Sequence, residues 1–360
     1  MKNKKVSIVG TVGLPANYGG FETLVENLAR YHDKQDLPYD ITVYCSSQSY
    51  TDKKDKYLSV DLKYIPLNAN GAQSIVYDMW SLLSAVWHRS DVILVLGVSG
   101  ATILPLIRLL SSAKIVTNID GIEWRRQKWK GLAKWFLRLS ERMAVRFSHE
   151  VIADNGAIAE YVNDTYGVDS HVIAYGGDHA VGVEAVPVDE LGLPHQYAFS
   201  VCRIEPENNV HMIVEAFSKQ DGLPLVMVGN WKSSEYGRGL QERFAGEPHI
   251  YLLDPIYDLG KLYTLRSRAL LYVHGHSAGG TNPSLVEAMH FAKPIVAYDC
   301  NFNRFTTEDK ALFFKDQASL QRLVVEIDSL PLTKVSGDMQ AIAKQNYTWD
   351  IVAEQYFNLF

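Results

Sequence analysis

Cysteine is scarce in this sequence of 360 residues, and the three that occur, Cys45, Cys202 and Cys300, lie far apart. Their number and spacing give neither a disulfide framework nor a zinc-binding pattern, so a reducing compartment fits best. The N-terminal stretch MKNKKVSIVG also has too few consecutive apolar residues for a secretory signal. A cytoplasmic protein is therefore expected.

The sequence also has no excess of basic residues. Its formal net charge is −6, which argues against a nucleic-acid binder and means that any basic surface must be local. Hydrophobic residues make up 47% and charged residues 21%, as in ordinary globular proteins. The length suggests two domains, because one domain usually holds roughly 100 to 200 residues.

No apolar run is long enough to span a membrane. Residues 92–107 carry no charge, but the run is shorter than the ~20 residues of a spanning helix and is interrupted by Gly97, Gly100 and Pro105. We expect a strand, a loop and a helix in this stretch.

Several catalytic signatures are missing: a Walker A motif, HExxH, GxSxG and two aspartates spaced as DxD. Neither a bound cofactor nor a metal-bridged diphosphate site is therefore expected. His274 and His276 are spaced so that they could bind a metal, but histidines of this kind more often line a pocket.

Short β-rich runs instead alternate with helical patterns along the chain, which is typical of parallel sheets covered by helices. An α/β fold with two Rossmann-like halves is predicted. The expected strands are residues 6–9, 41–45, 92–96, 114–118, 150–153, 197–201, 225–228, 270–274 and 294–298.

Clustered Gly and Pro and weak periodicity over residues 176–196 indicate the junction between the halves. We expect an N-terminal domain over residues 1–175 and a C-terminal domain over residues 176–340. Residues 341–360 end in a helical pattern that begins after Thr348, so this segment should pack back on the N-terminal domain.

The stretch GHSAGGTNPSLVEAM points to a phosphate site. Asn282 or Thr281 before Pro283 is a signal for a helix start, and the first amides of a helix have no partner within it. Together with the helix dipole they attract anions, and Gly279 and Gly280 would let a ligand approach the backbone.

Two charged residues could complete such a site. Glu287 lies near the start of the same helix and could accept hydrogen bonds from ribose hydroxyls, although a solvated glutamate is equally compatible with the spacing. Arg203 follows an expected strand and could grip a phosphate, or could simply pair with Glu205 or Glu207 at the surface.

A glycine-rich loop follows the first expected strand, in VGTVGLPANYGGFETL. It is not a GxGxxG fingerprint, and its Gly13, Gly19 and Gly20 could line a cleft or form a plain turn. A later stretch, WRRQKWKGLAKWFLRLSERM, predicts a basic amphipathic helix. Such a helix suits either an anionic membrane surface or a core-facing position with a solvated basic side. The residues expected on its membrane side are Trp129, Lys130, Lys134, Trp135 and Arg138.

The motifs GTVGLPANYGGFETLVENL, NIDGIEWRR, RIEPENN and HGHSAGGTNPSLVEAM extend over almost the whole chain. With them the sequence resembles the retaining GT-B glycosyltransferases of family 4, and within these the bacterial β-1,4-rhamnosyltransferase subgroup. The resemblance implies a GT-B fold, in which an acceptor-binding and a donor-binding Rossmann-like domain face each other across a cleft. It also implies a dTDP-L-rhamnose donor, a polyprenyl-diphosphate-linked sugar acceptor and a role in capsule, cell-wall or exopolysaccharide assembly. Peripheral association with the inner face of the cell membrane would follow.

The same resemblance assigns roles to individual residues. Arg203 would bind the donor diphosphate and Glu287 the ribose. Independently of the resemblance, the place of Asp120 at a strand end makes it a candidate for orienting the acceptor hydroxyl. Backbone amides of four residues would meet the phosphates: Gly280, Thr281, Asn282 and Ser284.

Two positions depart from the family pattern. Gly279 replaces a glutamate that touches the donor sugar in relatives, and Asn208, expected at the donor site, replaces a lysine. These departures leave two alternatives open: a non-catalytic nucleotide-binding partner subunit of a transferase complex, and a nucleotide-sugar epimerase on the same architecture.

Overall fold

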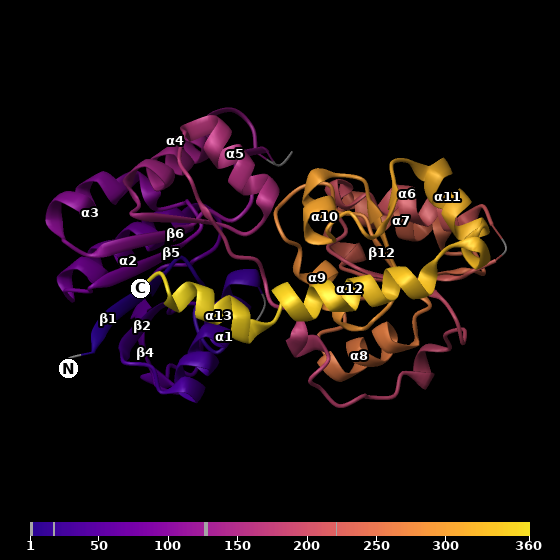
Figure 1. Ribbon diagram of the computed structural model, residues 1–360, viewed down its shortest axis with the longest axis horizontal. Helices are drawn as coiled ribbons and strands as arrows, with labels where there is room; N and C mark the ends of the chain where they lie inside the picture. Colours follow the sequence, from indigo (N-terminus) through magenta and orange to yellow (C-terminus); the bar gives the residue numbers. More distant parts are fainter. Residues whose placement is uncertain (1–2, 17–18, 126–128, 221) are drawn as a thin grey trace. The chain divides into compact units, whose positions relative to one another are not determined.

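The computed structural model describes residues 3–16, 19–125, 129–220 and 222–360. The chain forms two compact units (Figure 1). The first consists of Met1–Ala174 together with Trp349–Phe360, and the second of Tyr175–Thr348.

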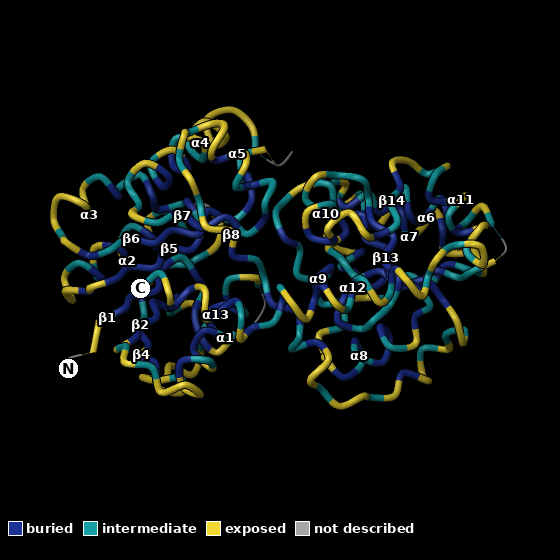
Figure 2. Tube along the Cα trace, viewed as in Figure 1, coloured by how far each residue is buried: buried dark blue, intermediate teal, exposed yellow. Residues whose placement is uncertain are grey.

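The first unit contains an eight-stranded sheet in the order β3-β4-β2-β1-β5-β6-β7-β8. Every neighbouring pair is parallel except β3 and β4. Its central strands are buried (Figure 2), which explains why they are apolar almost throughout rather than alternating. The strands are β1 (Lys4–Val9), β2 (Tyr39–Ser46), β3 (Lys56–Tyr57), β4 (Val60–Ile65), β5 (Val92–Leu96), β6 (Lys114–Asn118), β7 (Glu150–Ala153) and β8 (His171–Val172).

Helices connect these strands. Helix α3 (Leu104–Leu110) contacts both α2 (Ser74–Trp87) and α4 (Gly131–Phe147), whereas α1 (Gly20–Gln35) packs with α13 (Trp349–Phe357). Helix α5 (Gly156–Tyr166) follows β7. The chain leaves β1 toward β2 and later returns to the other side of β1. With right-handed crossovers this reversal puts α1 on one face of the sheet and α2, α3 and α4 on the other.

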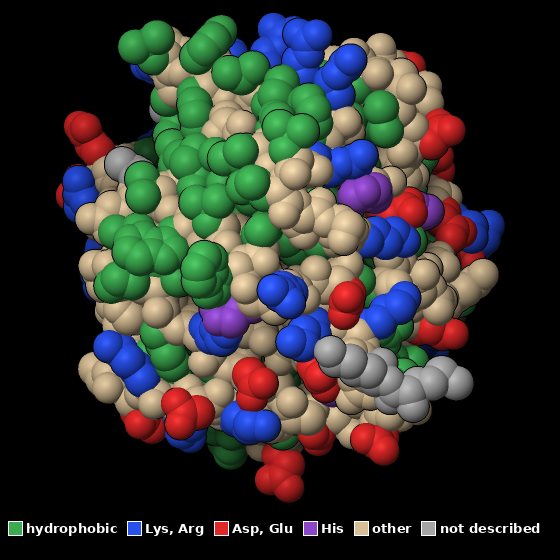
Figure 3. Space-filling model, turned by 90° about the vertical axis from the view of Figure 1, so that its left-hand side faces the viewer, with side chains coloured by type: hydrophobic (Ala, Val, Ile, Leu, Met, Phe, Trp, Pro, Cys, Tyr) green, Lys and Arg blue, Asp and Glu red, His purple; other side chains and the backbone are tan. Residues whose placement is uncertain are grey.

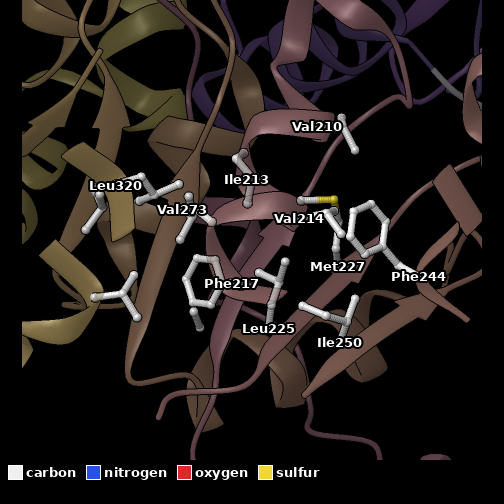
Figure 4. Close-up of a cluster of buried hydrophobic side chains, with 14 of the residues drawn as sticks. Val210, Ile213, Val214, Phe217, Leu225, Met227, Phe244, Ile250, Val273 and Leu320 are labelled. Atoms are coloured by element: carbon white, nitrogen blue, oxygen red, sulfur yellow. The ribbon is translucent and has the colours of Figure 1, made fainter. Parts of the chain in front are cut away.

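The second unit has a six-stranded parallel sheet in the order β11-β10-β9-β12-β13-β14. Its strands are β9 (Ala198–Val201), β10 (Leu225–Val228), β11 (Ile250–Leu253), β12 (Leu271–His274), β13 (Ile295–Tyr298) and β14 (Leu312–Phe314). Its α-helices are α6 (Val210–Ser218), α7 (Glu235–Phe244), α8 (Leu259–Arg268), α9 (Pro283–His290), α10 (Asn301–Thr306), α11 (Gln317–Val325) and α12 (Leu332–Asn346). Side chains of α6, including Ile213 and Phe217, meet Leu225, Met227 and Val273 of the strands in one buried cluster (Figure 4).

All nine expected strands are present, and residues 92–107 form the expected strand, loop and helix. Strands β3, β4, β8, β11 and β14 were not anticipated. They lie at or next to the edges of the sheets, where strands are short or half exposed and their apolar pattern is weak.

Two boundaries differ from the expectation. Residues 176–196 are not a free junction, because Gly177 packs against the backbone of α9 and Val186 against Gly260 of α8. The chain passes between the units at Ala174 and Tyr175. Residues 341–346 complete α12 in the second unit, so the segment that joins the first unit begins at Trp349.

Candidate functional site

Strands β9 and β12 are neighbours at the centre of the second sheet, although α6, α7, α8 and two strands separate them along the chain. The strand order reverses between them. In an open parallel sheet the crevice for a ligand lies at such a reversal, outside the carboxyl ends of the two strands. The loops that follow β9 and β12 carry Arg203 and Gly279, so folding brings two predicted site segments to one place.

Direct hydrogen bonds join these two loops. Ser277 donates from its amide (3.0 Å) and its hydroxyl (2.8 Å) to the carbonyl oxygen of Glu207. The side-chain amide of Asn209 donates to the carbonyl oxygen of Gly275 at 2.9 Å. A Cβ on Gly275 would lie 2.2 Å from the carbonyl oxygen of Asn208, so only glycine allows this approach.

Helix α9 begins as its sequence predicts, with Asn282 as cap and Pro283 in the first turn. The Asn282 side chain accepts a hydrogen bond from the amide of Ser284 at 3.0 Å. The amides of Leu285 and Val286 donate to the Asn282 carbonyl oxygen at 3.0 and 3.3 Å.

This capping corrects the expectation that the first helical amides, that of Ser284 among them, are unpaired. The room beside the backbone lies instead in the loop before the helix, at Gly279. Gly279 has a φ of 112°, and no atom lies within 4 Å of the position that its Cβ would take. Thr281, by contrast, is buried (5% exposed) and is part of the packed base of the loop.

Arg203 and Asn208 have different surroundings. The Arg203 side chain is half exposed, and its Nη1 lies 3.9 Å from Oε1 of Glu205, a loose surface contact. Asn208 is buried and donates from Nδ2 to the carbonyl oxygen of Arg203 at 2.7 Å. Asn208 thus holds the backbone that carries Arg203 rather than pointing outward as a substitute for the lysine.

Glu287 is part of an ion pair that the sequence reasoning missed. Its Oε2 accepts from Nη2 of Arg266 in a very short contact, and its Oε1 lies 3.3 Å from Nε2 of His179. Arg266 is 5% exposed and Glu287 15%. Burial opposes ionisation of Glu287, but Arg266 and His179 hold its pKa below the ordinary value, so the carboxylate is charged.

A signal for Arg266 was present in the sequence. In LGKLYTLRSRA it shares the buried side of α8 with Leu262 and Leu265, and a cation at a core position needs an acidic partner. His179 lies in the short helix η4 (Asp178–Ala180), which contacts α9.

His274 ends β12 with its ring fully buried and stacked on that of His276, with 4.4 Å between the ring centroids. Among the described atoms neither ring nitrogen of His274 has a hydrogen-bond partner. Burial holds its pKa well below the usual 6.5, and the nearby His276 lowers it further. His274 is therefore a neutral residue. No cluster of three or more potential metal ligands occurs among the described residues.

In the first unit, the glycine loop after β1 is held by Glu22 of α1. Its Oε1 accepts from the amide of Val12 at 2.8 Å and from the hydroxyl of Thr11 at 3.2 Å. Gly13 is needed for packing, since a Cβ there would lie 2.6 Å from Sγ of Cys45, whereas a Cβ on Gly19 would lie 1.8 Å from the Glu22 carboxylate and displace that side chain. The space beside Gly20 is open. Residues 17–18 of this loop lie outside the described ranges.

Asp120 follows β6 in a left-handed conformation, with a φ of 60°. Its amide donates to Oδ1 of Asn118 at 2.8 Å, and Asn118 in turn donates to the hydroxyl of Tyr356 at 2.6 Å. The Asn118 side chain therefore links the backbone of Asp120, just after β6, to Tyr356 of α13.

The basic stretch forms α4, as expected, while residues 126–128 before it lie outside the described ranges. Trp135 is 63% exposed, and Lys134 and Arg138 lie 5.4 and 5.3 Å from the centroid of the Trp124 ring. The indole of Trp129 donates to Glu123 at 2.9 Å. Among the described helices, none combines the length and apolarity that a membrane crossing requires.

Two family models match the chain. Residues 190–346 match glycosyl transferases group 1, and residues 3–178 match a domain of unknown function, DUF1972. A search of curated proteins finds no match.

Solved structures resemble the whole chain. Sucrose-phosphate synthase from Thermosynechococcus elongatus has a TM-score of 0.80 at 15% identity, with 99% of this chain and 98% of that chain covered. HepE of Anabaena in complex with UDP has a TM-score of 0.74 at 17% identity, with the same coverage. A structure described as trehalose-6-phosphate from E. coli bound with UDP-2-fluoro glucose has a TM-score of 0.74 at 11% identity, again covering 99% and 98%.

At these identities the likeness shows the fold, and the fold is GT-B. The match over residues 190–346 covers the unit in which the loops of Arg203 and Gly279 meet. The chain therefore has the GT-B fold, and residues 190–346 of its second unit match glycosyl transferases group 1.

Proposed function

We propose that this protein is a retaining glycosyltransferase that moves L-rhamnose from dTDP-L-rhamnose to a polyprenyl-diphosphate-linked sugar in bacterial polysaccharide assembly. The observation that carries the proposal is the junction of the Arg203 loop and the Gly279 loop at the strand-order reversal of the second unit. A cation, a glycine-rich backbone and an ionised glutamate come from the two strand ends and the helix that follows.

The diphosphate would lie against the loop of Gly279 and Gly280, within reach of Arg203. Arg203 is half exposed, and its contact with Glu205 is long enough to break at little cost, so the guanidinium is available to a phosphate. A bidentate contact between guanidinium and phosphate is stronger than this surface pair. With Asn208 engaged elsewhere, Arg203 would supply the positive charge that relatives share between arginine and lysine.

The ribose would be held by Glu287. Its carboxylate is ionised and oriented by Arg266 and His179, and a carboxylate offers about four acceptor positions, so capacity for hydroxyl groups is left. Arg266 is a positioning residue here, because its buried side chain fixes Glu287 from behind.

Catalysis would consist mainly of stabilising the leaving group. As the bond between the anomeric carbon and the diphosphate breaks, its electron pair goes to the phosphate oxygen, where Arg203 and the loop amides offset the growing charge. That oxygen takes the proton of the acceptor hydroxyl, whose oxygen forms the new bond on the same face of the sugar. Asp120, on its fixed turn after β6, would orient this hydroxyl.

The choice of nucleotide and sugar rests on the sequence motifs. Related structures hold UDP or a UDP-sugar, which supports a nucleoside-diphosphate sugar as donor in general terms. With Gly279 in place of a glutamate, the surroundings of the donor sugar differ from those in relatives that carry the glutamate, which is compatible with a 6-deoxy sugar that lacks one hydroxyl.

A lipid-linked acceptor would require access to a membrane. The expected contacts are the tryptophans and cations at the start of α4, of which Lys130, Lys134, Trp135 and Arg138 are exposed. Such a helix binds anionic lipid surfaces through both apolar burial and charge.

The decisive experiment incubates the full chain with a panel of nucleotide sugars and a polyprenyl-diphosphate-linked sugar, and analyses the products by mass and, for anomeric configuration and sugar identity, by NMR. We expect an acceptor that gains one deoxyhexose only with dTDP-L-rhamnose, with retention at the anomeric carbon. Product from another donor would correct the sugar. An isomerised sugar without acceptor would indicate an epimerase, and nucleotide binding without any product would indicate a partner subunit.

A further inference from the structure

Helices α2, α3 and α4 of the first unit expose an unusual number of large apolar side chains. Trp87 and Leu109 are 85% exposed and Leu132 is 84% exposed. Figure 3 shows a broad apolar area on the side of the molecule that it views, with lysine and arginine side chains gathered along its upper edge. The exposed apolar residues on the three helices are Val76, Trp80, Leu83, Trp87, Leu106, Leu109, Leu110, Leu132 and Trp135.

The pattern on α2 is that of a second apolar face, not of scattered residues. Its inner face is buried through Tyr77, Leu82 and Ala85. Its outer face repeats apolar residues at helical spacing, from Val76 to Trp87, where a surface helix normally carries polar groups. Because α3 contacts both α2 and α4, the outer faces of the three helices form one surface, which we call the α2–α4 face. Contiguous apolar surface of this kind marks an interaction site.

The charges on the same helices are almost all of one sign. Helices α2 and α4 contain one acidic residue each, Asp78 and Glu141, and both are buried. Asp78 accepts from the hydroxyl of Ser99, and Glu141 accepts from Tyr161 and Tyr166, so neither carboxylate faces solvent. The exposed charged residues of the three helices are Arg108, Lys134, Arg138, Arg142 and Arg146.

Exposed apolar side chains together with exposed cations indicate which kind of partner binds the α2–α4 face. The whole chain has a net charge of −6, yet the α2–α4 face exposes only cations between its apolar side chains. A second copy of the chain docked face to face would bring like charges together. A bilayer with anionic headgroups accepts both components, because tryptophans and leucines enter the interface while lysine and arginine meet the phosphates.

We infer that the α2–α4 face is the surface by which this protein sits on an anionic membrane, with Trp80, Trp87 and Leu109 inserted at headgroup depth. Helix α4 alone would give a narrow contact, whereas α2 and α3 add most of the apolar side chains. The inference deepens the proposed function, because a lipid-linked acceptor lies at such a surface, but binding to lipid does not depend on sugar transfer.

The test is flotation of the full chain with vesicles of phosphatidylcholine alone or mixed with phosphatidylglycerol. We expect binding to the anionic vesicles that weakens with added salt. In the double variant Trp87→Ser, Leu109→Ser, binding should fall by about tenfold or more, since two inserted side chains are lost. A matched control, Tyr257→Ser with Val325→Ser, changes two exposed apolar residues of the second unit and should bind as the unaltered chain does.

A second variant tests the charge. Arg142→Glu with Arg146→Glu should lower binding to anionic vesicles roughly tenfold or more without altering the little binding to neutral ones. Absence of vesicle binding by the unaltered chain would overturn the inference, as would equal binding of Trp87→Ser, Leu109→Ser. The inference would also be overturned if the unaltered chain formed a dimer in solution and Trp87→Ser, Leu109→Ser dissociated it.

The outcome is separable from the proposed function. Transfer to a short, water-soluble acceptor should be unchanged in Trp87→Ser, Leu109→Ser, because neither residue belongs to the donor site. Vesicle binding without any transfer by the unaltered chain would end the transferase proposal and leave the membrane surface standing.

Discussion

At the scale of single residues, the candidate site depends on how Arg203 and Glu287 are surrounded. Arg203 is half exposed with one loose contact, whereas Glu287 is held by a buried guanidinium and a histidine. An exposed cation can move to a ligand, and a buried carboxylate presents a fixed set of acceptors. The two residues therefore suit different tasks, the first meeting developing charge and the second orienting the nucleoside.

Replacement of Arg203 by alanine should lower the turnover number by roughly a hundredfold or more, because its charge would act on the departing diphosphate. Steady-state kinetics with dTDP-L-rhamnose and the lipid-linked acceptor measure this. Arg238→Ala, which removes an exposed arginine elsewhere in the second unit, serves as control. An Arg203→Ala enzyme with unaltered turnover would remove this residue from the mechanism.

Replacement of Arg266 by alanine should destabilise the second unit by about 3 to 5 kcal/mol, because it leaves Glu287 buried without its main partner. Urea unfolding followed by hydrogen exchange of the second unit measures the change. The double variant Arg266→Met, Glu287→Leu should recover most of the loss, since it leaves no unpaired charge. A small effect of Arg266→Ala would mean that His179 alone compensates the carboxylate.

The lowered pKa of the buried His274 makes the stability of the protein depend on pH. The folded protein holds its pKa well below 6.5, so below pH 6.5 the unfolded chain binds a proton that the folded chain does not. The free energy of unfolding must then fall as the pH decreases below 6.5, with a limiting slope of about 1.4 kcal/mol per pH unit from this group. Stability curves between pH 5 and 8 should flatten in His274→Phe, which retains a ring against His276. Parallel curves for the two proteins would contradict this origin.

At the scale of elements, the sequence predicted the local features of helices and strands better than it predicted which of them lie side by side. The start of α9 at Pro283 with Asn282 as cap follows from residues within one turn, and the structure confirms it. The prediction that the first amides of α9 are unpaired was wrong for Ser284, because the Asn282 side chain that caps the helix accepts a hydrogen bond from the amide of Ser284. The edge strands were missed because half-exposed strands lack a continuous apolar run.

The contribution of the Asn282 cap to the stability of α9 can be tested by mutation. Asn282→Ala should destabilise α9 by about 1 kcal/mol, because the amide of Ser284 loses its acceptor. Faster hydrogen exchange at the start of α9 measures this, while Asn282→Ser should keep most of the protection. If both variants exchange like the unaltered chain, the hydrogen bond between Asn282 and Ser284 contributes nothing to the helix.

At the scale of the whole molecule, the C-terminal residues Trp349–Phe360 pack in the first unit, with the N-terminal part of the chain. Phe357 of α13 is buried and stacks on Tyr39 of β2, with 5.5 Å between ring centroids, and Tyr356 accepts from Asn118 of β6. The first unit is therefore completed by residues that follow the entire second unit. The core of the second unit shares no strand with that of the first.

Phe357→Ala should lower the stability of the first unit by about 3 to 5 kcal/mol, because it empties a buried aromatic site. Hydrogen exchange resolved by unit should show the loss between residues 3 and 174 and little change between residues 175 and 348. Glu354→Ala, on the exposed side of the same helix, is the control. An equal loss in both units would mean that they unfold as one.

The sequence by itself determined the alternation of strands and helices, the helix start at Pro283, the lack of a basic excess and the motifs of the site loops. These depend on neighbours within one or two turns, or on simple counts. Tertiary structure alone decided that β9 lies beside β12, that Arg266 and His179 reach Glu287, and that the second apolar face of α2 points outward. Each of these is set by packing between segments far apart in the chain, and an apolar helix reads the same in sequence whether its outer face is covered or bare.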